Sequence, residues 1–198
     1  MALEKLTIDN TPSNQNIYLA LFRDVDADTT QALQKQLLAR NPAFEYAFID
    51  ASSIISRVHL LSAIYNALNA VATNTLQTPN VHSEIVLSLS PSNNIADAYR
   101  RWGFAAGKTT DLIVVKVVFH DNEQTEEQVW AHLKEHIPTG TVVDPITDEE
   151  IAKSTDWSKV RKYYKLNGVP ALDRIKDDAE KKREMERLAV MGMALRGL

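Results

Sequence analysis

The sequence predicts an α/β fold, in one domain that spans residues 1–198. Two observations lead to this prediction: apolar runs of strand length occur at residues 17–22 and 112–119, and segments with apolar residues at helical spacing alternate with them. A chain of 198 residues is long enough for one domain with a core of its own. We expect a central sheet of four short strands covered by helices, and the alternation of strands and helices alone favours parallel strand order.

Two strands and one helix are expected in the first third of the chain. The strands are residues 17–22 and 46–49, each a short continuous apolar run. Residues 28–30 offer a cap for the helix between them, and Pro42 ends it. The apolar stripe of this helix consists of Leu33, Leu37 and Leu38.

A long amphipathic helix follows, and Ser52 or Ser53 offers its cap. Apolar side chains recur along it at the spacing of one helix face. They are Val58, Leu61, Ile64, Tyr65, Leu68 and Val71. The helix leads into a loop at residues 73–80.

The centre of the chain is expected to hold two buried strands that flank a short helix. The first strand is residues 85–89, the helix is residues 95–102, and the second strand is the apolar run already named. Polar residues then fall at a strand-to-helix junction, where free backbone N–H groups and the helix dipole favour an anion or a hydrogen-bonding ligand. They are Ser90, Asn93 and Asn94.

The last third of the chain reads as helical. We expect a helix at residues 123–136, a connector at 141–155, a helix at 156–166 and a final helix from 170 to 195 within the C-terminal segment 170–198. The final helix is charged in its middle and apolar at its tip, which indicates docking of the tip on its own core or on another protein. Its apolar tip residues are Leu188, Met191 and Leu195.

Composition excludes several classes of function. The net charge of −4 argues against a generally basic nucleic-acid binder, although a local basic patch stays possible. The chain has no cysteine, so a disulfide framework and cysteine-ligated metal sites are excluded. No run has the length of a membrane span, and the first residues lack the apolar core of a signal peptide. We expect a soluble, intracellular protein that needs no cofactor.

Three apparent catalytic motifs fail on inspection. Residues 103–109 resemble a phosphate-binding loop, but the spacing is one residue short and the segment precedes a strand. His132, Glu135 and His136 match the H-x-x-E-H pattern of zinc hydrolases, yet no third ligand recommends itself. No G-x-S-x-G elbow exists. We expect no enzyme, and a zinc hydrolase using His132 and His136 stays the alternative, followed by a small-molecule sensor at Asn93 and Asn94.

Basic residues beside an aromatic residue give a better binding candidate. Arg100 and Arg101 precede Trp102, and Lys108 follows nearby. Guanidinium groups pair with phosphates and stack on bases, so this cluster suits RNA. A solvated helix face explains the same pattern about as well.

Several runs also resemble a known family. The central runs are His82-Ser83-Glu84-Ile85, Leu89-Ser90-Pro91, Asn94-Ile95-Ala96-Asp97-Ala98, Gly103 and Leu112-Ile113-Val114-Val115-Lys116. The flanking runs are residues 46–50, 62–65, 160–166 and 195–198. Together they resemble the kinase-binding (CGI family) subunit of the KEOPS/EKC complex, fungal type, over nearly the whole chain. Trp102 departs from the phenylalanine usual before the glycine.

The resemblance implies a non-catalytic subunit with two kinds of partner. Such a subunit binds the complex's small atypical protein kinase and supports its activity, and through the kinase it meets the threonylcarbamoyl transferase subunit. The complex makes threonylcarbamoyladenosine next to the tRNA anticodon, and this subunit helps recruit tRNA by its 3′ CCA end. In fungi the complex is linked to telomere maintenance and transcription, which implies a place in nucleus and cytoplasm.

The resemblance also guides the fold and the site residues. It implies a mixed or antiparallel sheet and a role for the end helix in kinase binding. The expected kinase-binding residues are Leu188, Met191, Leu195 and Arg196. The expected tRNA-binding residues, chosen by their chemistry, are Ser90, Asn93, Asn94, Arg100, Arg101 and Lys108.

Overall fold

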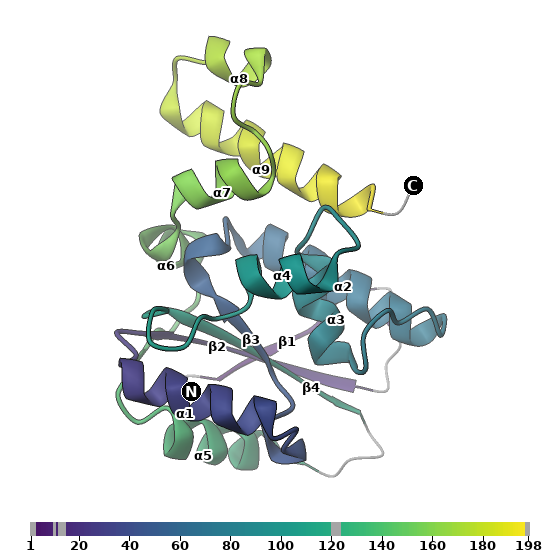
Figure 1. Cartoon of the computed structure of the whole chain (residues 1–198), viewed down its shortest axis with the longest axis vertical. Helices are drawn as coiled ribbons and strands as arrows, with labels where there is room; N and C mark the ends of the chain where they lie inside the picture. The colour runs from purple at the N-terminus through teal and green to yellow at the C-terminus, as the bar shows by residue number, and fades with distance from the viewer. Residues whose placement is uncertain (1–2, 10, 12–14, 120–123, 197–198) are drawn as a thin grey trace.

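The computed structural model describes residues 3–9, 11, 15–119 and 124–196 (Figure 1). The strands within these ranges are β1 (Glu4–Leu6), β2 (Gln15–Arg23), β3 (Ala47–Asp50), β4 (Leu112–Phe119) and β5 (Thr141–Val142). The α-helices are α1 (Ala27–Leu38), α2 (Arg57–Ala72), α3 (Val81–Ser88), α4 (Ile95–Trp102), α5 (Glu126–His136), α6 (Asp148–Ser154), α7 (Trp157–Tyr163), α8 (Pro170–Arg174) and α9 (Asp178–Ala194). Short 3₁₀ turns lie at η1 (Pro42–Phe44) and η2 (Ala51–Ser53).

The strands form one antiparallel sheet in the order β1-β2-β4-β3, and β5 also pairs with β2. The expected α/β class, the antiparallel order and the long C-terminal helix are therefore confirmed. The expected count of four strands is wrong for the described residues, which form five. β1 and β5 are too short, at three and two residues, to give a period-two signal in the sequence.

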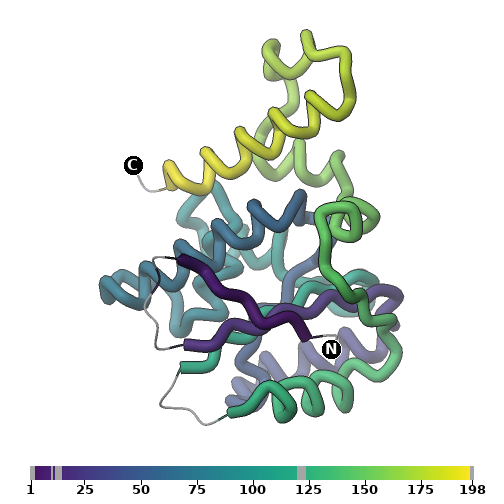
Figure 2. The backbone as a smooth tube through the Cα atoms, turned by 180° about the vertical axis from the view of Figure 1, so that it is seen from behind, coloured from purple at the N-terminus to yellow at the C-terminus, as the bar shows by residue number. Residues whose placement is uncertain are grey.

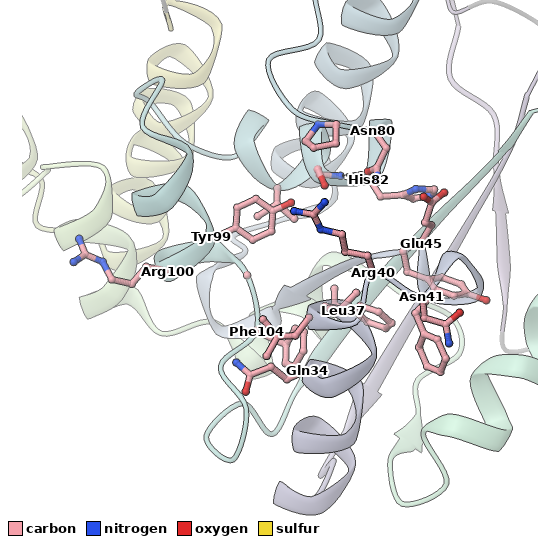
Figure 3. A pocket seen from close by; sticks show the side chains of 18 residues that line it. Gln34, Leu37, Arg40, Asn41, Glu45, Asn80, His82, Tyr99, Arg100 and Phe104 are labelled. Atoms are coloured by element: carbon pink, nitrogen blue, oxygen red, sulfur yellow. Dashed lines mark hydrogen bonds between the residues drawn. The ribbon is translucent and has the colours of Figure 1, made fainter.

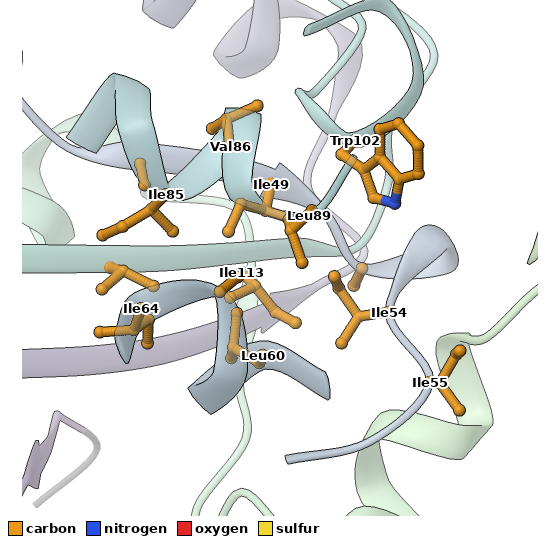
Figure 4. Packing of buried hydrophobic residues seen from close by; sticks show 14 of the residues in the cluster. Ile49, Ile54, Ile55, Leu60, Ile64, Ile85, Val86, Leu89, Trp102 and Ile113 are labelled. Carbon is orange, nitrogen blue, oxygen red and sulfur yellow. The ribbon is translucent and has the colours of Figure 1, made fainter. Parts of the chain in front are cut away.

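Helices cover both faces of the sheet, which explains why its central strands are apolar throughout (Figure 1). On β2, Ile17, Leu19 and Leu21 join the core under α2 and α3, while Tyr18, Ala20 and Phe22 join the core toward α1 and α5. Figure 4 shows the first of these cores, where side chains of α2, α3 and the sheet interdigitate around Ile113.

The expected strand at residues 85–89 is wrong, because this run belongs to α3. Asn80 caps the helix, and its Oδ1 accepts the backbone N–H of Ser83 at 2.9 Å. α3 is buried on nearly all sides, so its sequence is apolar without a helical stripe. A short apolar run of this kind does not distinguish a buried strand from a buried helix.

The caps expected for α1 and α2 are displaced along the chain. Asp26 caps α1, ahead of the expected residues 28–30, and Ser56 caps α2 in place of Ser52 or Ser53. In both helices the buried face also differs from the expected apolar stripe. Leu38 is 78% exposed and Val58 is 56% exposed, although both were assigned to buried stripes.

The C-terminal region is more divided than expected. The connector at 141–155 contains β5 and α6, and the side chain of Ile151 buries α6 against the core. The expected helix from 170 to 195 is two helices, because Ile175 has extended backbone and Asp177 starts a new helix by accepting the N–H of Glu180 at 2.7 Å. Figure 2 shows α9 lying alongside α2.

A buried hydrogen-bond relay ties this region to the rest of the fold. The Nε2–H of His59 on α2 donates to the hydroxyl of Tyr164 at 2.6 Å, and that hydroxyl donates to the carbonyl of Leu89 at 2.5 Å. His59 Nδ1 accepts the N–H of Ile55 at 3.2 Å, which fixes this tautomer. One tyrosine thus connects α2, the end of α3 and the segment after α7.

Candidate functional site

α9 has one face committed to the core and one face free. Met185, Ala189 and Met193 are buried against the core of the protein. The next face carries Met191, which is 44% exposed, and beyond it Leu195, which is 56% exposed. Exposed apolar side chains on a helix that is already anchored are typical of a docking surface for another protein.

The end of α9 is fixed to α3 by Arg196. Its guanidinium donates to the carbonyl of Leu87 at 2.6 Å and lies 3.7 Å from the carboxylate of Glu84. The Glu84 carboxylate is almost wholly buried and also accepts the N–H groups of Gln77 and Thr78, both at 3.0 Å. Burial lowers the pKa of Arg196, and Glu84 partly offsets this effect. Arg196 therefore positions the exposed tip of α9.

An apolar groove runs between α2 and α9. It has a cavity volume of about 350 Å³. Its lining residues are Ile8, Val58, Leu61, Ser62, Tyr65, Asn66, Val190 and Ala194. Val190 and Ala194 lie next to Met191 and Leu195 along α9, so the groove and the exposed tip are neighbouring parts of one surface.

A second, larger cavity of about 700 Å³ lies at the free edge of β3 (Figure 3). The end of α1 forms one wall, and α3 and α4 form the other. The apolar and aromatic lining residues are Leu37, Leu38, Phe44, Tyr46, Phe48, Val86, Tyr99 and Phe104. Polar side chains of Gln34, Arg40, Asn41, Glu45, Asn80, His82, Ser83 and Arg100 complete the lining. We call this cavity the β3-edge pocket.

His82 lines this pocket and also satisfies a backbone N–H group of the sheet. β3 pairs with β4 only as far as Val115, so the N–H of Val117 has no strand partner on that side. The Nε2 atom of His82 accepts this N–H at 3.0 Å, while its Nδ1 atom finds no hydrogen-bond partner within the described part of the chain. Burial, together with the nearby Lys116, lowers the pKa of His82 to about 3.

The arginines around the pocket differ in how available their guanidinium groups are to a ligand. Arg40 is exposed and reaches from the end of α1 toward Tyr99 (Figure 3). Arg100 has a side chain that is 75% exposed; it pairs with Asp97 and points away from the pocket. Arg101 also pairs with Asp97, at 2.9 Å, and donates to the carbonyl of Tyr163 at 3.2 Å. Arg101 therefore joins α4 to α7 and is less available to a ligand.

Comparison with known proteins decides the family. The family model "Kinase binding protein CGI-121" matches residues 22–197. The chain belongs to the CGI-121 family. It is 54% identical, over all of both chains, to the EKC/KEOPS complex subunit cgi121 of Neurospora crassa. It is 52% identical, again over all of both chains, to the EKC/KEOPS complex subunit CGI121 of Gibberella zeae, and 35% identical to that of Schizosaccharomyces pombe, over 69% of this chain and 75% of the relative.

The kinase-binding residues expected from the CGI-121 resemblance occupy different environments. Met191 and Leu195 are exposed, as a docking role requires. Leu188 is half-buried and packs against the core. The guanidinium of Arg196 is bonded to α3, and the side chain is only 12% exposed. These four residues do not form one exposed patch.

The expected tRNA-binding residues are also dispersed. Ser90 is buried, and its Oγ accepts the N–H of Ser92 at 3.1 Å. The Oδ1 of Asn94 caps α4 by accepting the N–H of Asp97 at 3.0 Å. Asn93 is exposed in the same turn and Lys108 is exposed on the following loop. Because α3 is a helix, this turn joins two helices, and the expected strand-to-helix junction does not exist.

Of the expected tRNA-binding residues, only Arg100 lines the β3-edge pocket. The pocket was missed because its walls come from segments far apart in the sequence, such as Arg40, Phe44 and Phe104. His82 stood in a run that carried the family resemblance, and that was the one signal available.

The two histidines of the hydrolase alternative form a packed cluster. The rings of His132 and His136 stack with centroids 4.4 Å apart, and Phe44 packs edge-on against both. The Nδ1 atom of His132 is 3.0 Å from the hydroxyl of Tyr46, and burial lowers the pKa of His132. Within the described ranges, no group of three or more potential ligands could hold a metal. The arrangement gives a zinc hydrolase no support.

A membrane-spanning role has no support in the described residues either. None of their helices combines the length and the apolar character that crossing a bilayer requires.

Proposed function

We propose that this chain is the non-catalytic subunit of a KEOPS/EKC complex that binds and supports the complex's small atypical kinase. The relatives are named as subunits of that complex, and the family is named for kinase binding. The observation that carries the proposal here is the exposed apolar tip of α9. Met191 and Leu195 stay exposed although Arg196 holds the tip in a fixed place.

The groove between α2 and α9 extends this proposed kinase surface. Val58 is 56% exposed on α2, and Val190 and Ala194 continue the apolar surface onto α9. An apolar groove next to an exposed apolar tip offers a connected area, with a pocket into which an anchor residue of the kinase fits.

A binding titration with the complex's kinase subunit tests this surface. Leu195→Asp places a charge on it, and we expect affinity to fall more than tenfold because a carboxylate would lose water at the interface. Leu38→Asp is the matched control, since Leu38 is more exposed but lies at the end of α1. Equal binding by Leu195→Asp and wild type would move the kinase site away from α9.

Truncation after Arg187 is a weaker test of the same surface. It would remove Ala189 and Met193 from the core together with the exposed tip, and it would also remove the Arg196 anchor. Loss of binding would then have two explanations. The point substitution avoids this problem, because exposed positions contribute little to stability.

We also propose that the chain helps recruit tRNA through its unpaired 3′ CCA end, for modification of the adenosine beside the anticodon. The β3-edge pocket supports this, because its aromatic walls suit a base and Arg40 suits a phosphate, while the exposed Arg100 points away from the pocket and suits a phosphate elsewhere on the same RNA strand. The test is the salt dependence of tRNA binding, for which Arg100→Glu is the sharper variant, since Arg101 is bonded to Tyr163. We expect weaker binding and a smaller salt slope. An unchanged slope would reject Arg100 as a phosphate contact.

The remaining parts of the proposal follow from membership in the complex. The chain would meet the threonylcarbamoyl transferase subunit through the kinase and carry no catalytic group of its own. It would act in nucleus and cytoplasm, with the fungal links of the complex to telomere maintenance and transcription. Deletion of the chain from a reconstituted complex should lower both kinase activity and tRNA modification, and undiminished activity would contradict a supporting role.

A further inference from the structure

His82, which lines the β3-edge pocket, carries a buried ring donor that no group of the described residues uses. His82 is 5% exposed and lines the pocket. Its Nε2 atom accepts the N–H of Val117, so in the neutral ring the proton is on Nδ1. Nδ1 has no hydrogen-bond partner among the residues that the structure describes. A buried donor without a partner costs about 1–3 kcal/mol, so most buried polar groups in proteins are paired.

The tautomer of His82 is fixed by its hydrogen bond to Val117 of the sheet. Reversing the tautomer would leave the N–H of Val117 facing a protonated Nε2, which cannot accept it. Protonation of the ring would do the same, and the pKa of His82 is lowered to about 3 by burial. The ring therefore offers a ligand one donor and no acceptor.

The surroundings of His82 narrow the class of ligand. The cavity of about 700 Å³ is lined by Phe44, Phe48, Tyr99 and Phe104, which suit a flat ring. Arg40 is exposed at its α1 wall and supplies a positive charge. A nucleobase joined to a phosphate has both features, together with ring nitrogens or carbonyl oxygens that accept hydrogen bonds.

We propose that His82 is the specificity-determining residue of this pocket, and that its Nδ1–H donates to an acceptor atom of a bound nucleotide. The proposal rests on the tRNA-recruiting function and names the group that reads the terminal nucleotide. A site with a buried polar group rejects a ligand that lacks the complementary atom, because the group is then left unpaired. The same nucleotide chemistry is available from an RNA end or from a free nucleotide.

The acceptor can be located by deleting candidate atoms from the ligand. The probes are a tRNA ending in CCA and versions whose terminal adenosine is the 1-deaza, 3-deaza, 7-deaza or 3′-deoxy analogue. We expect wild-type protein to bind one of these about tenfold more weakly than the parent tRNA, which is the effect of one lost hydrogen bond. Equal affinity for all of them would overturn the proposal, without any change in the protein.

Two substitutions of His82 separate its effect on ligand discrimination from its effect on stability. Gln at position 82 can still accept the N–H of Val117 but lacks the ring donor, so His82→Gln should bind the parent and the sensitive analogue equally. Asn at position 82 can place an amide donor near the position of Nδ1 but leaves Val117 unpaired, so His82→Asn should keep part of the discrimination and lose stability. Discrimination by His82→Gln equal to that of wild type would show that His82 only caps the sheet.

Two further results distinguish the proposed role of His82 from the tRNA-recruiting function on which it rests. If wild-type protein fails to bind the parent tRNA, both the recruiting function and the reading by His82 are rejected. If tRNA binds and every analogue binds equally, only His82 is rejected. Titration with AMP identifies the source: binding of AMP that His82→Gln weakens would keep His82 as the reader and make a free nucleotide the occupant.

Discussion

The relay from His59 through Tyr164 to Leu89 gives the sharpest test of how the C-terminal helices are held. Tyr164→Phe removes one oxygen atom and keeps the ring, whose centroid lies 5.5 Å from that of Trp102. The hydroxyl accepts from His59 at 2.6 Å and donates to Leu89 at 2.5 Å, and all three residues are buried. The substitution therefore leaves a buried donor and a buried acceptor without this partner.

The expected cost follows from these two groups. A buried polar group that loses its partner costs about 1–3 kcal/mol, so for two such groups the loss of unfolding free energy should be about 2–6 kcal/mol. For a chain of this size, each kcal/mol lowers Tm by about 2–4 °C. We expect a fall in Tm of about 4–24 °C by these magnitudes.

Urea unfolding and a thermal scan measure this cost, and the neighbouring tyrosine supplies the control. Tyr163→Phe removes the same atom from a half-buried ring that also packs 5.5 Å from Trp102, and within the described ranges no relay passes through its hydroxyl. The control should change stability by less than about 0.5 kcal/mol. If Tyr164→Phe is as mild as Tyr163→Phe, the relay does not hold the C-terminal helices and the reasoning is wrong.

Two other predictions concern stability. Burial lowers the pKa of His59 and of His82 to about 3 in the folded protein, so below pH 6.5 the unfolded chain binds protons that the folded protein does not. The free energy of unfolding, measured by urea titration, should therefore fall as pH drops from 6.5 to 5, by up to about 1.4 kcal/mol per pH unit for each histidine. Constant stability over this range would contradict the burial of both histidines as neutral rings. Gly103→Ala should destabilise, because its Cβ would lie 2.6 Å from the carbonyl oxygen of Tyr99, whereas Gly192→Ala on α9 should stabilise by about 0.5–1 kcal/mol, since its nearest contact is 3.5 Å away. Equal thermal shifts for the two variants would refute the steric argument.

The bounds of an element were predictable where its own residues carry a strong local signal. α4 and β4 have the expected bounds, since Asn94 and the run 112–119 carry strong local signals. α3 was misread because burial on all sides removes the helical stripe that would have identified it. The division between α8 and α9 depends on Asp177, whose capping preference was outweighed in the sequence by the good helix formers around it.

The candidate site was much less predictable than the fold. A docking role for Met191 and Leu195 could be anticipated, because an apolar tip on a charged helix shows in the sequence. The β3-edge pocket could not be anticipated, because it forms at the unpaired edge of β3, between the end of α1 on one side and α3 and α4 on the other. Arg101 looked like a ligand contact until the structure placed its guanidinium on Tyr163.

Both candidate surfaces depend on α3, and this determines which variants can separate them. Near its start, His82 faces the β3-edge pocket. Two residues later, the carboxylate of Glu84 faces Arg196 at the end of α9 and also accepts the N–H groups of Gln77 and Thr78 in the loop before Asn80. A substitution of Glu84 would disturb the pocket wall and the α9 tip together, so combined loss of kinase and tRNA binding would not identify a contact with either partner. Exposed positions such as Leu195 and Arg100 lie on one surface each, and only variants of that kind assign the two activities to their sites.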